Sequence, residues 1–204
     1  PGEAGPGPAR AQAGWPRGGR ARGRPASGGP GPAVRFHDRK DRTRPMDEAR
    51  GIAKLAGFPE RRVEVDVCGR CHARRGQLTD RLAFGHPLSD THRVALLEDG
   101  LYWPDGQMRD EVYNYGSFLQ SRMFAQGVTC SDCHDPHSLK LRAPGNAVCA
   151  QCHALAKYDA AAHHHHQPGS KGAECAACHM PATTYMGVDP RHDHSLRIPR
   201  PDLS

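Results

Sequence analysis

Hydrophobic residues occur along this chain in short, interrupted groups rather than in long periodic runs. The spacing of the apolar positions predicts three short helices, over residues 47–56, 90–99 and 117–126. Residues 63–67 (VEVDV) alternate between apolar and acidic side chains, which predicts a short strand. A turn is expected at Pro104-Asp105-Gly106. The pattern therefore predicts small elements rather than a large packed core.

Glycine and proline divide the chain into two parts. Residues 1–34 contain ten Gly and seven Pro. A segment of this kind buries too little apolar surface to offset its ordering entropy. We therefore predict a disordered Gly/Pro/Arg-rich segment over residues 1–46 and a folded domain over residues 47–204. Beyond residue 128 we expect short helices and loops with almost no strand, and no run of about 18 apolar residues predicts a membrane span.

The positive charge is concentrated in the first part of the chain. Residues 1–62 hold 14 basic and six acidic side chains, whereas residues 63–204 hold 14 basic and 16 acidic ones. The cysteine-bearing part is therefore not expected to bind nucleic acid. An RGG-like arm for RNA or anionic surfaces is an alternative for Arg17–Arg20, but Trp15 is the only aromatic nearby, so we favour a linker.

All eight cysteines belong to C-x-x-C pairs, and a histidine follows each pair. We number the four motifs in chain order: motif 1 (68–72), motif 2 (130–134), motif 3 (149–153) and motif 4 (175–179). Two thiols three residues apart lie on one side of a helical turn, where they can form thioether bonds to the two vinyl groups of one haem. The next residue places an imidazole under the iron. C-x-x-C-H is the attachment signal for haem c.

The motifs predict four covalently attached haem c groups. The expected thioether residues are Cys68, Cys71, Cys130, Cys133, Cys149, Cys152, Cys175 and Cys178, and the expected proximal iron ligands are His72, His134, His153 and His179. So short a chain cannot insulate four haems, so we expect them to be close together. The short spacer between motifs 2 and 3 predicts that those two are neighbours.

Other roles for paired cysteines fit this pattern less well. Zinc ribbons and fingers use two C-x-x-C pairs per metal but need no histidine after each pair. A thioredoxin-like motif requires one pair within a βαβ unit, and disulfides would not require the histidines. The fold class that we predict is therefore one of mainly short α-helices and loops wrapped around covalently bound haems.

The remaining histidines are candidates for the sixth ligand of each iron. A distal histidine gives a low-potential haem, whereas methionine raises the potential. His137 lies too close in sequence to His134 to reach the far side of the same haem, so it is a candidate for a neighbouring iron. His194 follows motif 4 by 15 residues, and Asp193 or Asp189 is placed to orient its ring.

Weaker candidates lie before motif 2. His92 is on the predicted helix 90–99, His86 precedes a proline, and His37 falls in the segment predicted to be disordered. Three methionines are expected to pack in the core instead: Met108, Met123 and Met186.

Four consecutive histidines, His163–His166, precede motif 4 in the stretch HHHHQPGSKGAECAACHMP. An affinity tag is usually terminal and six residues long, and a separate Zn, Cu or Ni site is a further alternative. We favour a sixth ligand for a neighbouring iron, with the turn at 167–169 setting its direction. Four adjacent imidazoles cannot all face one iron, so we choose His164 and His165 for their central position.

Residues 63–204 resemble the haem-binding part of bacterial multihaem cytochromes c. The resemblance rests on three stretches: GVTCSDCHDPHSLKLRAPGNAVCAQCH, HHHHQPGSKGAECAACHMP and DHSLRIPRPDLS. Relatives of this type are often joined to tetratricopeptide repeats, which implies that the chain is part of a longer protein. The ending CHMP…DH is similar to the last haem segment of pentahaem nitrite reductase, where the histidine of the DH pair is a distal ligand. The resemblance thus supports that role for His194.

The expected function is electron transfer through four closely spaced c-type haems, with redox proteins as partners. The alternative is a haem-dependent reductase of a nitrogen or sulfur oxyanion, or a fragment of one, because related octahaem enzymes oxidise hydroxylamine or reduce tetrathionate or sulfite. The chain lacks the C-x-x-C-K motif of many nitrite reductases, and its only polar cluster suited to a substrate is Tyr113, Tyr115 and Arg122. The family resemblance implies a periplasmic location, and nothing in the sequence indicates an oligomeric state.

Overall fold

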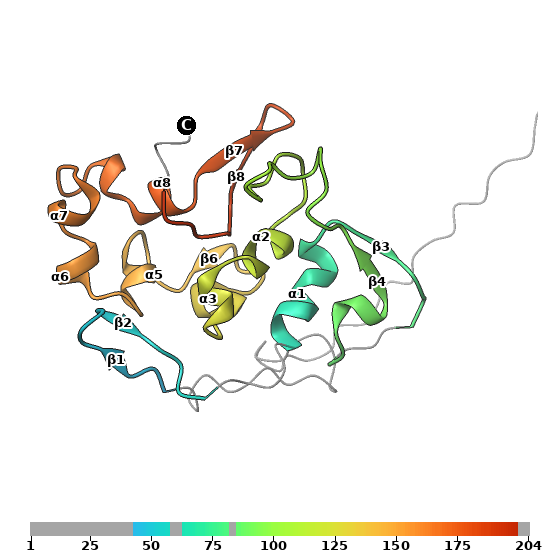
Figure 1. The fold of residues 1–204 in the computed structure, drawn as a ribbon, viewed down its shortest axis with the longest axis horizontal. Helices are drawn as coiled ribbons and strands as arrows, with labels where there is room; N and C mark the ends of the chain where they lie inside the picture. Colours follow the sequence, from blue (N-terminus) through green and yellow to red (C-terminus); the bar gives the residue numbers. More distant parts are fainter. Residues whose placement is uncertain (1–42, 58–62, 82–84, 200–204) are drawn as a thin grey trace, which may run out of the picture.

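The computed structural model describes residues 43–57, 63–81 and 85–199, and its elements are all short (Figure 1). Residues 1–42, with most of the predicted disordered segment and His37, lie outside the described residues. The α-helices are α1 Val63–His72, α2 Tyr115–Leu119, α3 Arg122–Ala125, α4 Cys130–Cys133, α5 Ala147–Ala150, α6 Leu155–Tyr158, α7 Ala161–His164 and α8 Cys175–His179. Two 3-10 helices are η2 Leu88–Asp90 and η3 Lys171–Ala173.

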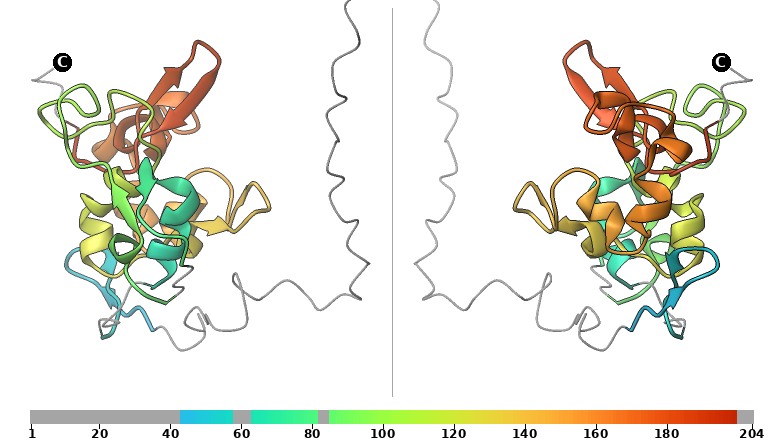
Figure 2. Two further views of the ribbon diagram at one scale, coloured as in Figure 1. Left: turned by 90° about the vertical axis from the view of Figure 1, so that its right-hand side faces the viewer. Right: turned by 90° about the vertical axis from the view of Figure 1, so that its left-hand side faces the viewer.

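Strands pair locally into four antiparallel hairpins in the described part of the chain. The pairs are β1 Met46–Asp47 with β2 Ile52–Ala53, β3 Arg75–Gln77 with β4 His92–Val94, β5 His134–Asp135 with β6 Lys140–Leu141, and β7 Ala182–Tyr185 with β8 Asp189–His192. The predicted short helices and loops are present, but helices do not dominate the fold. The expectation of almost no strand beyond residue 128 is wrong, because hairpins β5–β6 and β7–β8 lie there. Hairpins β5–β6 and β7–β8 project from the body (Figure 2).

The strand predicted at residues 63–67 is wrong, because these residues form the first turns of α1. Val65 and Gly69, one helical turn apart, are both buried, and Gly69 lies against the ring of Tyr115 and the side chain of Leu88. The acidic side chains in the first turn also favour the positive end of the helix dipole. A five-residue alternation could not reveal a helix whose buried positions extend into motif 1.

The helix predicted at residues 47–56 is also wrong, because this segment forms hairpin β1–β2. Gly51 adopts a φ of 66° in the connecting turn, which glycine tolerates and which ends a right-handed helix. The Asp47 carboxylate accepts a hydrogen bond from the backbone N–H of Arg50 at 3.1 Å. The hairpin docks on the segment after motif 3, where Ala53 N donates to Cys152 O at 2.7 Å and Ala154 N to Gly51 O at 2.8 Å.

Of the other two predicted helices, the one at residues 90–99 is wrong and the one at 117–126 is partly correct. Residues 90–99 hold the end of η2 and strand β4 instead of a helix, and Leu96 and Leu97 are exposed. The helix at 117–126 is present in two pieces, α2 and α3, and the Ser121 side chain caps the second by accepting from Phe124 N. The predicted turn at residues 104–106 is confirmed, with Gly106 N donating to Trp103 O at 2.7 Å.

Few apolar side chains are buried together. One buried cluster contains Tyr102, Met108, Val112 and Tyr185, so Met108 packs in the core as predicted. Large apolar side chains elsewhere are exposed, including Leu139, Val188 and Met186. The fold therefore depends on local pairing and polar contacts rather than on a large side-chain core. None of the helices in the described residues has the length and apolarity of a membrane span.

Candidate functional site

Helical turns carry the cysteines of the motifs. Both cysteines of motifs 1, 2 and 4 lie within α1, α4 and α8 respectively. Helix α5 of motif 3 ends at Ala150, and Cys152 and His153 follow in a turn in which His153 N donates to Cys149 O at 3.0 Å. The i, i+3 spacing therefore places both sulfur atoms of a motif on one side of a helical turn, as thioether bonds to one haem require.

The four motifs lie in contact in their sequence order. The thiols of Cys68 and Cys130 share a hydrogen bond, which joins motif 1 to motif 2. Gln151 Nε2 donates to Asp132 O at 3.2 Å, which places motif 3 beside motif 2. Cys149 and Cys175 share a second hydrogen bond, which joins motif 3 to motif 4. The motifs thus form a continuous series from one end of the site to the other.

Burial and proximity change the acidity of the free thiols. Their shared hydrogen bond lowers the pKa of Cys68 and raises that of Cys130, so Cys130 retains its proton. Burial raises the pKa of Cys149 to about 12, and burial also raises the pKa of Cys175. Cys130 and Cys149 are therefore protonated near neutral pH. No group of three or more metal-binding side chains gathers in the described residues, so the zinc alternative gains no support.

A buried carboxylate joins α1 to the beginning of α4. Glu64 is 7% exposed and lies four residues before Cys68. It accepts hydrogen bonds from Ser131 N at 2.6 Å, Ser131 Oγ at 2.9 Å and Thr129 Oγ1 at 3.2 Å. Asp132 completes a capping box with Thr129 and pairs with Arg44 at 2.7 Å. The N-terminus of α4 is therefore held by side chains from three segments.

An asparagine makes the corresponding link between motifs 3 and 4. Asn146 lies three residues before Cys149, and its Oδ1 accepts from Cys175 N, the first residue of α8, at 2.8 Å. Its Nδ2 donates to Asp159 Oδ1 and to Ala173 O, both at 2.9 Å. In both pairs of motifs, a polar side chain just before the earlier motif accepts from backbone N–H groups at the start of the later helix.

Two pairs of histidine rings face one another across the site. The ring centres of His134 and His194 are 6.1 Å apart with planes at 26°, and those of His163 and His179 are 6.1 Å apart with planes at 9°. Metal–imidazole bonds of about 2.0–2.1 Å on opposite sides of one metal would separate two ring centres by about 6.3 Å. The separation of ring centres in each pair therefore matches that of two axial ligands on one iron, at motif 2 for the first pair and at motif 4 for the second.

Backbone carbonyls orient two of these four rings. His179 Nδ1 lies 2.7 Å from Arg197 O, and His194 Nδ1 lies 2.8 Å from His192 O. A carbonyl oxygen only accepts, so each Nδ1 carries the proton and Nε2 keeps a free lone pair. Burial lowers the pKa of His194 and of His153, which favours the uncharged imidazole that binds metals.

The remaining predicted distal ligands lie elsewhere. His137 is exposed, with a φ of 61°, in the turn of hairpin β5–β6. His86 is exposed and lies 3.7 Å from Asp90. His92 is buried on β4, not on a helix, and its Nδ1 lies 2.8 Å from Thr91 Oγ1. No ring contact between these three histidines and a motif histidine is found in the described residues.

Within the run of four histidines, the structure distinguishes the individual side chains. His163 faces motif 4, as described above. His164 Nδ1 instead accepts from His166 N at 3.1 Å, and the two rings are 6.5 Å apart. His165 is exposed at the C-terminal end of α7, with a left-handed φ of 59°. The sequence offered only weak signals for His163: the alanines at 160–162 favour a short helix, and Pro168 requires it to end nearby.

The polar cluster considered for substrate binding has structural roles. Tyr115 donates from its hydroxyl to Asp66 Oδ1 at 2.8 Å, and burial, followed by this hydrogen bond, raises the pKa of Tyr115. The guanidinium of Arg191 lies 5.1 Å from the ring centre of Tyr113. These contacts of Tyr115 and Tyr113 stabilise neighbouring elements and do not form a common anion site.

Met186, which was expected to pack in the core, is instead exposed in the turn of hairpin β7–β8.

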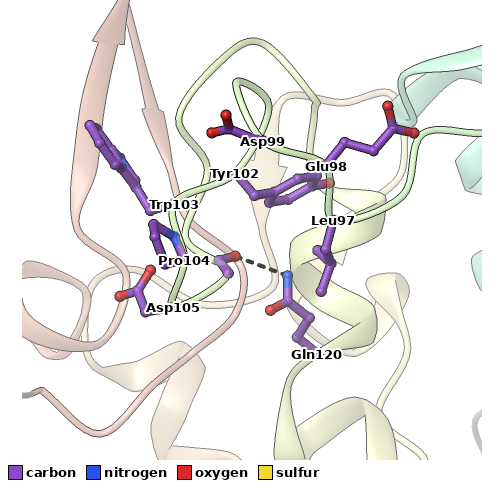
Figure 3. A pocket seen from close by; sticks show the side chains of 9 residues that line it. Leu97, Glu98, Asp99, Tyr102, Trp103, Pro104, Asp105 and Gln120 are labelled. Carbon is purple, nitrogen blue, oxygen red and sulfur yellow. Dashed lines mark hydrogen bonds between the residues drawn. The ribbon is translucent and has the colours of Figure 1, made fainter.

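A shallow cavity of about 360 Å³ lies beside the loop that precedes α2 (Figure 3). Its lining includes Tyr102, Trp103 and Gln120, and Gln120 Nε2 donates to Gly106 O at 3.0 Å. The charged side chains of this lining are all acidic: Glu98, Asp99 and Asp105. Two of these acids are paired with arginines, Asp99 with Arg109 and Asp105 with Arg197. None of the lining residues is a motif cysteine or histidine, so this cavity gives no support to a haem-dependent reductase.

Comparison with known proteins identifies the centre of the site. Residues 122–157 match a family model described as "Doubled CXXCH motif", and this range includes motifs 2 and 3. Searches of curated proteins and of solved structures give no match. The matched region is a haem-binding region like that of multihaem c-type cytochromes, and its motifs indicate covalently bound haem c.

Proposed function

We propose that this protein transfers electrons, one at a time, through four haem c groups attached at motifs 1 to 4. The observation that carries the proposal is the unbroken series of motif contacts, from Cys68 and Cys130, through Asp132 and Gln151, to Cys149 and Cys175. Haems attached at motifs that contact one another must themselves be close together. Short distances between haems are the condition for rapid electron transfer.

Cysteines and histidines of the chain would hold each haem in different ways. The two cysteines of each motif provide covalent attachment, and His72, His134, His153 and His179 provide the proximal ligands. When bound, haem supplies an iron that changes between two oxidation states. The protein contributes axial ligands, hydrogen bonds to those ligands, and partial exclusion of water, which together set the reduction potential.

His194 is the proposed distal ligand of the group at motif 2. It faces His134 at 6.1 Å, and His192 O fixes its ring orientation. A second imidazole stabilises a six-coordinate iron at low potential, whereas an open position would allow substrate to bind. This pairing favours an electron carrier over a reductase at motif 2.

Redox proteins are the proposed partners. Attachment of haem c implies an extracytoplasmic location in general, and we propose the periplasm for this protein. An electron carrier requires transient contacts, for which small interfaces are sufficient.

The test is expression in a host that attaches haem c, followed by intact-mass measurement and a redox titration. We expect four haems per chain and reversible uptake of one electron per haem. Cys175→Ala combined with Cys178→Ala is expected to remove one haem, because it removes both thioether residues of motif 4 alone. A chain that contains zinc and no haem would contradict the proposal. A high-spin signal that shifts with nitrite or sulfite would favour the reductase instead.

A further inference from the structure

We propose that His163 is the sixth ligand of the haem iron at motif 4 and that Tyr158 positions it. The inference rests on the proposed function, because it requires a haem at motif 4. It assigns one member of the histidine run to one iron and gives a role to a residue outside every motif.

The first argument is the geometry of the pair. His163 and His179 have the same centre-to-centre separation as His134 and His194, 6.1 Å, although the two pairs come from different elements. His179 is the histidine of motif 4, and its proton is held on Nδ1 by Arg197 O. Its Nε2 is therefore available for the iron, and His163 lies where a ligand on the opposite side would be.

The second argument is the behaviour of the neighbouring histidines. The backbone reverses at His165, whose left-handed conformation ends α7. Beyond this reversal, the ring of His166 packs over Gly172, where an added Cβ would lie 2.6 Å from its Nδ1. His164 is paired with His166 by a backbone-to-ring hydrogen bond. His163 is thus the member of the run that α7 directs toward motif 4.

The third argument is the position of Tyr158, the last residue of α6. Its ring meets His153 edge-on at 5.3 Å and 88°, and meets His163 edge-on at 5.3 Å and 87°. His153 is the histidine of motif 3, so one aromatic ring separates a motif 3 ligand from the proposed motif 4 ligand. Edge-to-face contacts of this kind favour a defined ring orientation.

Hairpin β1–β2 anchors Tyr158 from the other side. The Tyr158 hydroxyl donates to Arg50 O at 2.6 Å, and Lys157 Nζ donates to Ala49 O at 3.1 Å. Figure 1 shows the hairpin beside α5 and α6, at the end of the molecule that also holds α7. This hydrogen bond fixes the direction of the Tyr158 side chain, so its ring stays between His153 and His163 and limits the rotation of His163.

The test compares single variants of the haem-loaded protein by electron paramagnetic resonance and potentiometry. His163→Ala is expected to convert one low-spin haem to high spin, and His163→Met is expected to keep it low-spin and to raise the midpoint potential of one haem. His165→Asn is the matched control from the same run, because it removes the imidazole while asparagine tolerates the left-handed backbone at this position, and neither measurement is expected to change. Low-spin signals and potentials unchanged in both His163 variants would overturn the assignment.

Tyr158 is tested separately, because its role is to orient the ligand. The g-values of a low-spin ferric haem depend on the angle between its two imidazole planes, which is 9° for this pair. Tyr158→Ala is expected to shift the g-values of one haem, and Tyr158→Phe to shift them less, because the ring remains and only the hydrogen bond to Arg50 O is lost. Unchanged g-values in Tyr158→Ala would overturn the positioning role.

Haem counting separates failure of this inference from failure of the proposed function. Intact mass is measured on every variant before spectroscopy. If the parent chain carries no haem at motif 4, the proposed function fails there. If all motifs are loaded and the His163 variants match the parent, the ligand assignment alone is wrong.

Discussion

Two helix junctions in this molecule are held by different polar side chains. One joins α1 to α4, and the other joins α5 to α8. Each brings the first cysteines of two motifs together, and in each a side chain preceding the earlier motif caps the later helix. The α1–α4 junction uses the carboxylate of Glu64, which is buried and accepts three hydrogen bonds. The α5–α8 junction uses the neutral amide of Asn146.

The difference shows how a chain with little core distributes its stability. A buried carboxylate that loses its partners is costly, so the α1–α4 junction is rigid but intolerant of change. The neutral amide costs less to bury and to lose. The α5–α8 junction gains further support from outside, through hairpin β1–β2 and its hydrogen bonds to the chain around motif 3. The two junctions should therefore respond differently to matched substitutions.

Removing the carboxylate should have the largest effect. Glu64→Ala removes the acceptor of Ser131 N and Ser131 Oγ and one of the two acceptors of Thr129 Oγ1, and should lower the free energy of unfolding by about 3 kcal/mol. Guanidinium unfolding followed by circular dichroism measures this change. Glu48→Ala, an exposed site in the β1–β2 turn, is the control and should change stability by less than about 0.5 kcal/mol. Equal effects at the two glutamates would show that the cap is not important.

A methyl group added inside motif 1 should have the next largest effect. A Cβ at Gly69 would lie 2.6 Å from Tyr115 Cδ2 and 2.8 Å from Leu88 Cδ2, so one of these packed groups must move. Gly69→Ala should lower the free energy of unfolding by about 2 kcal/mol. Gly76→Ala is a matched control, because no heavy atom lies within 4 Å of its added Cβ. A neutral Gly69→Ala would indicate that α1 and α2 are not closely packed.

The amide link should be less sensitive than the carboxylate link. Asn146→Ala removes the acceptor for Cys175 N and should lower the free energy of unfolding by about 1 kcal/mol, as for loss of a helix cap. Glu174→Ala changes the N-cap residue of α8 itself, whose side chain makes no capping hydrogen bond, and should cost less. If Asn146→Ala were as harmful as Glu64→Ala, the contrast between the junctions would be lost.

Lowering the pH should produce the smallest effect, through protonation of Asp47 in hairpin β1–β2, which contacts the chain around motif 3. The hydrogen bond from Arg50 N, and then the charge and hydrogen bond of Lys54, hold the pKa of Asp47 below its usual value. A lowered folded-state pKa stabilises hairpin β1–β2 above the unfolded value of about 3.9, and this stabilisation is lost as the pH falls through the folded-state pKa. Hydrogen exchange at Ala53, corrected for its intrinsic rate, should therefore increase in acid, and Asp47→Asn should remove that dependence. An acid response retained in Asp47→Asn would assign it to another group.

The sequence predicted the helical turns of the C-x-x-C-H motifs better than it predicted the hairpins. The i, i+3 cysteines and the following histidine are local, so the helical turns of motifs 2 and 4 follow directly from the spacing. Hairpins of two to four residues per strand carry no readable alternation, and β1–β2 is held by contacts with residues about a hundred positions later. His163 was not distinguishable within its run, because its direction depends on the reversed backbone at His165 and on Tyr158.

Hairpin β1–β2 also imposes an order on assembly. Its residues precede all four motifs in the chain, yet Tyr158, which binds Arg50 O, lies 108 residues further on. Contacts so distant in sequence form late, because closing a long loop costs entropy before any contact is gained. The hairpin bonds to Cys152 O and so closes against the segment that must receive a haem. We therefore expect hairpin β1–β2 to close after the thioether bonds of motif 3 have formed, and to restrict access to that motif afterwards.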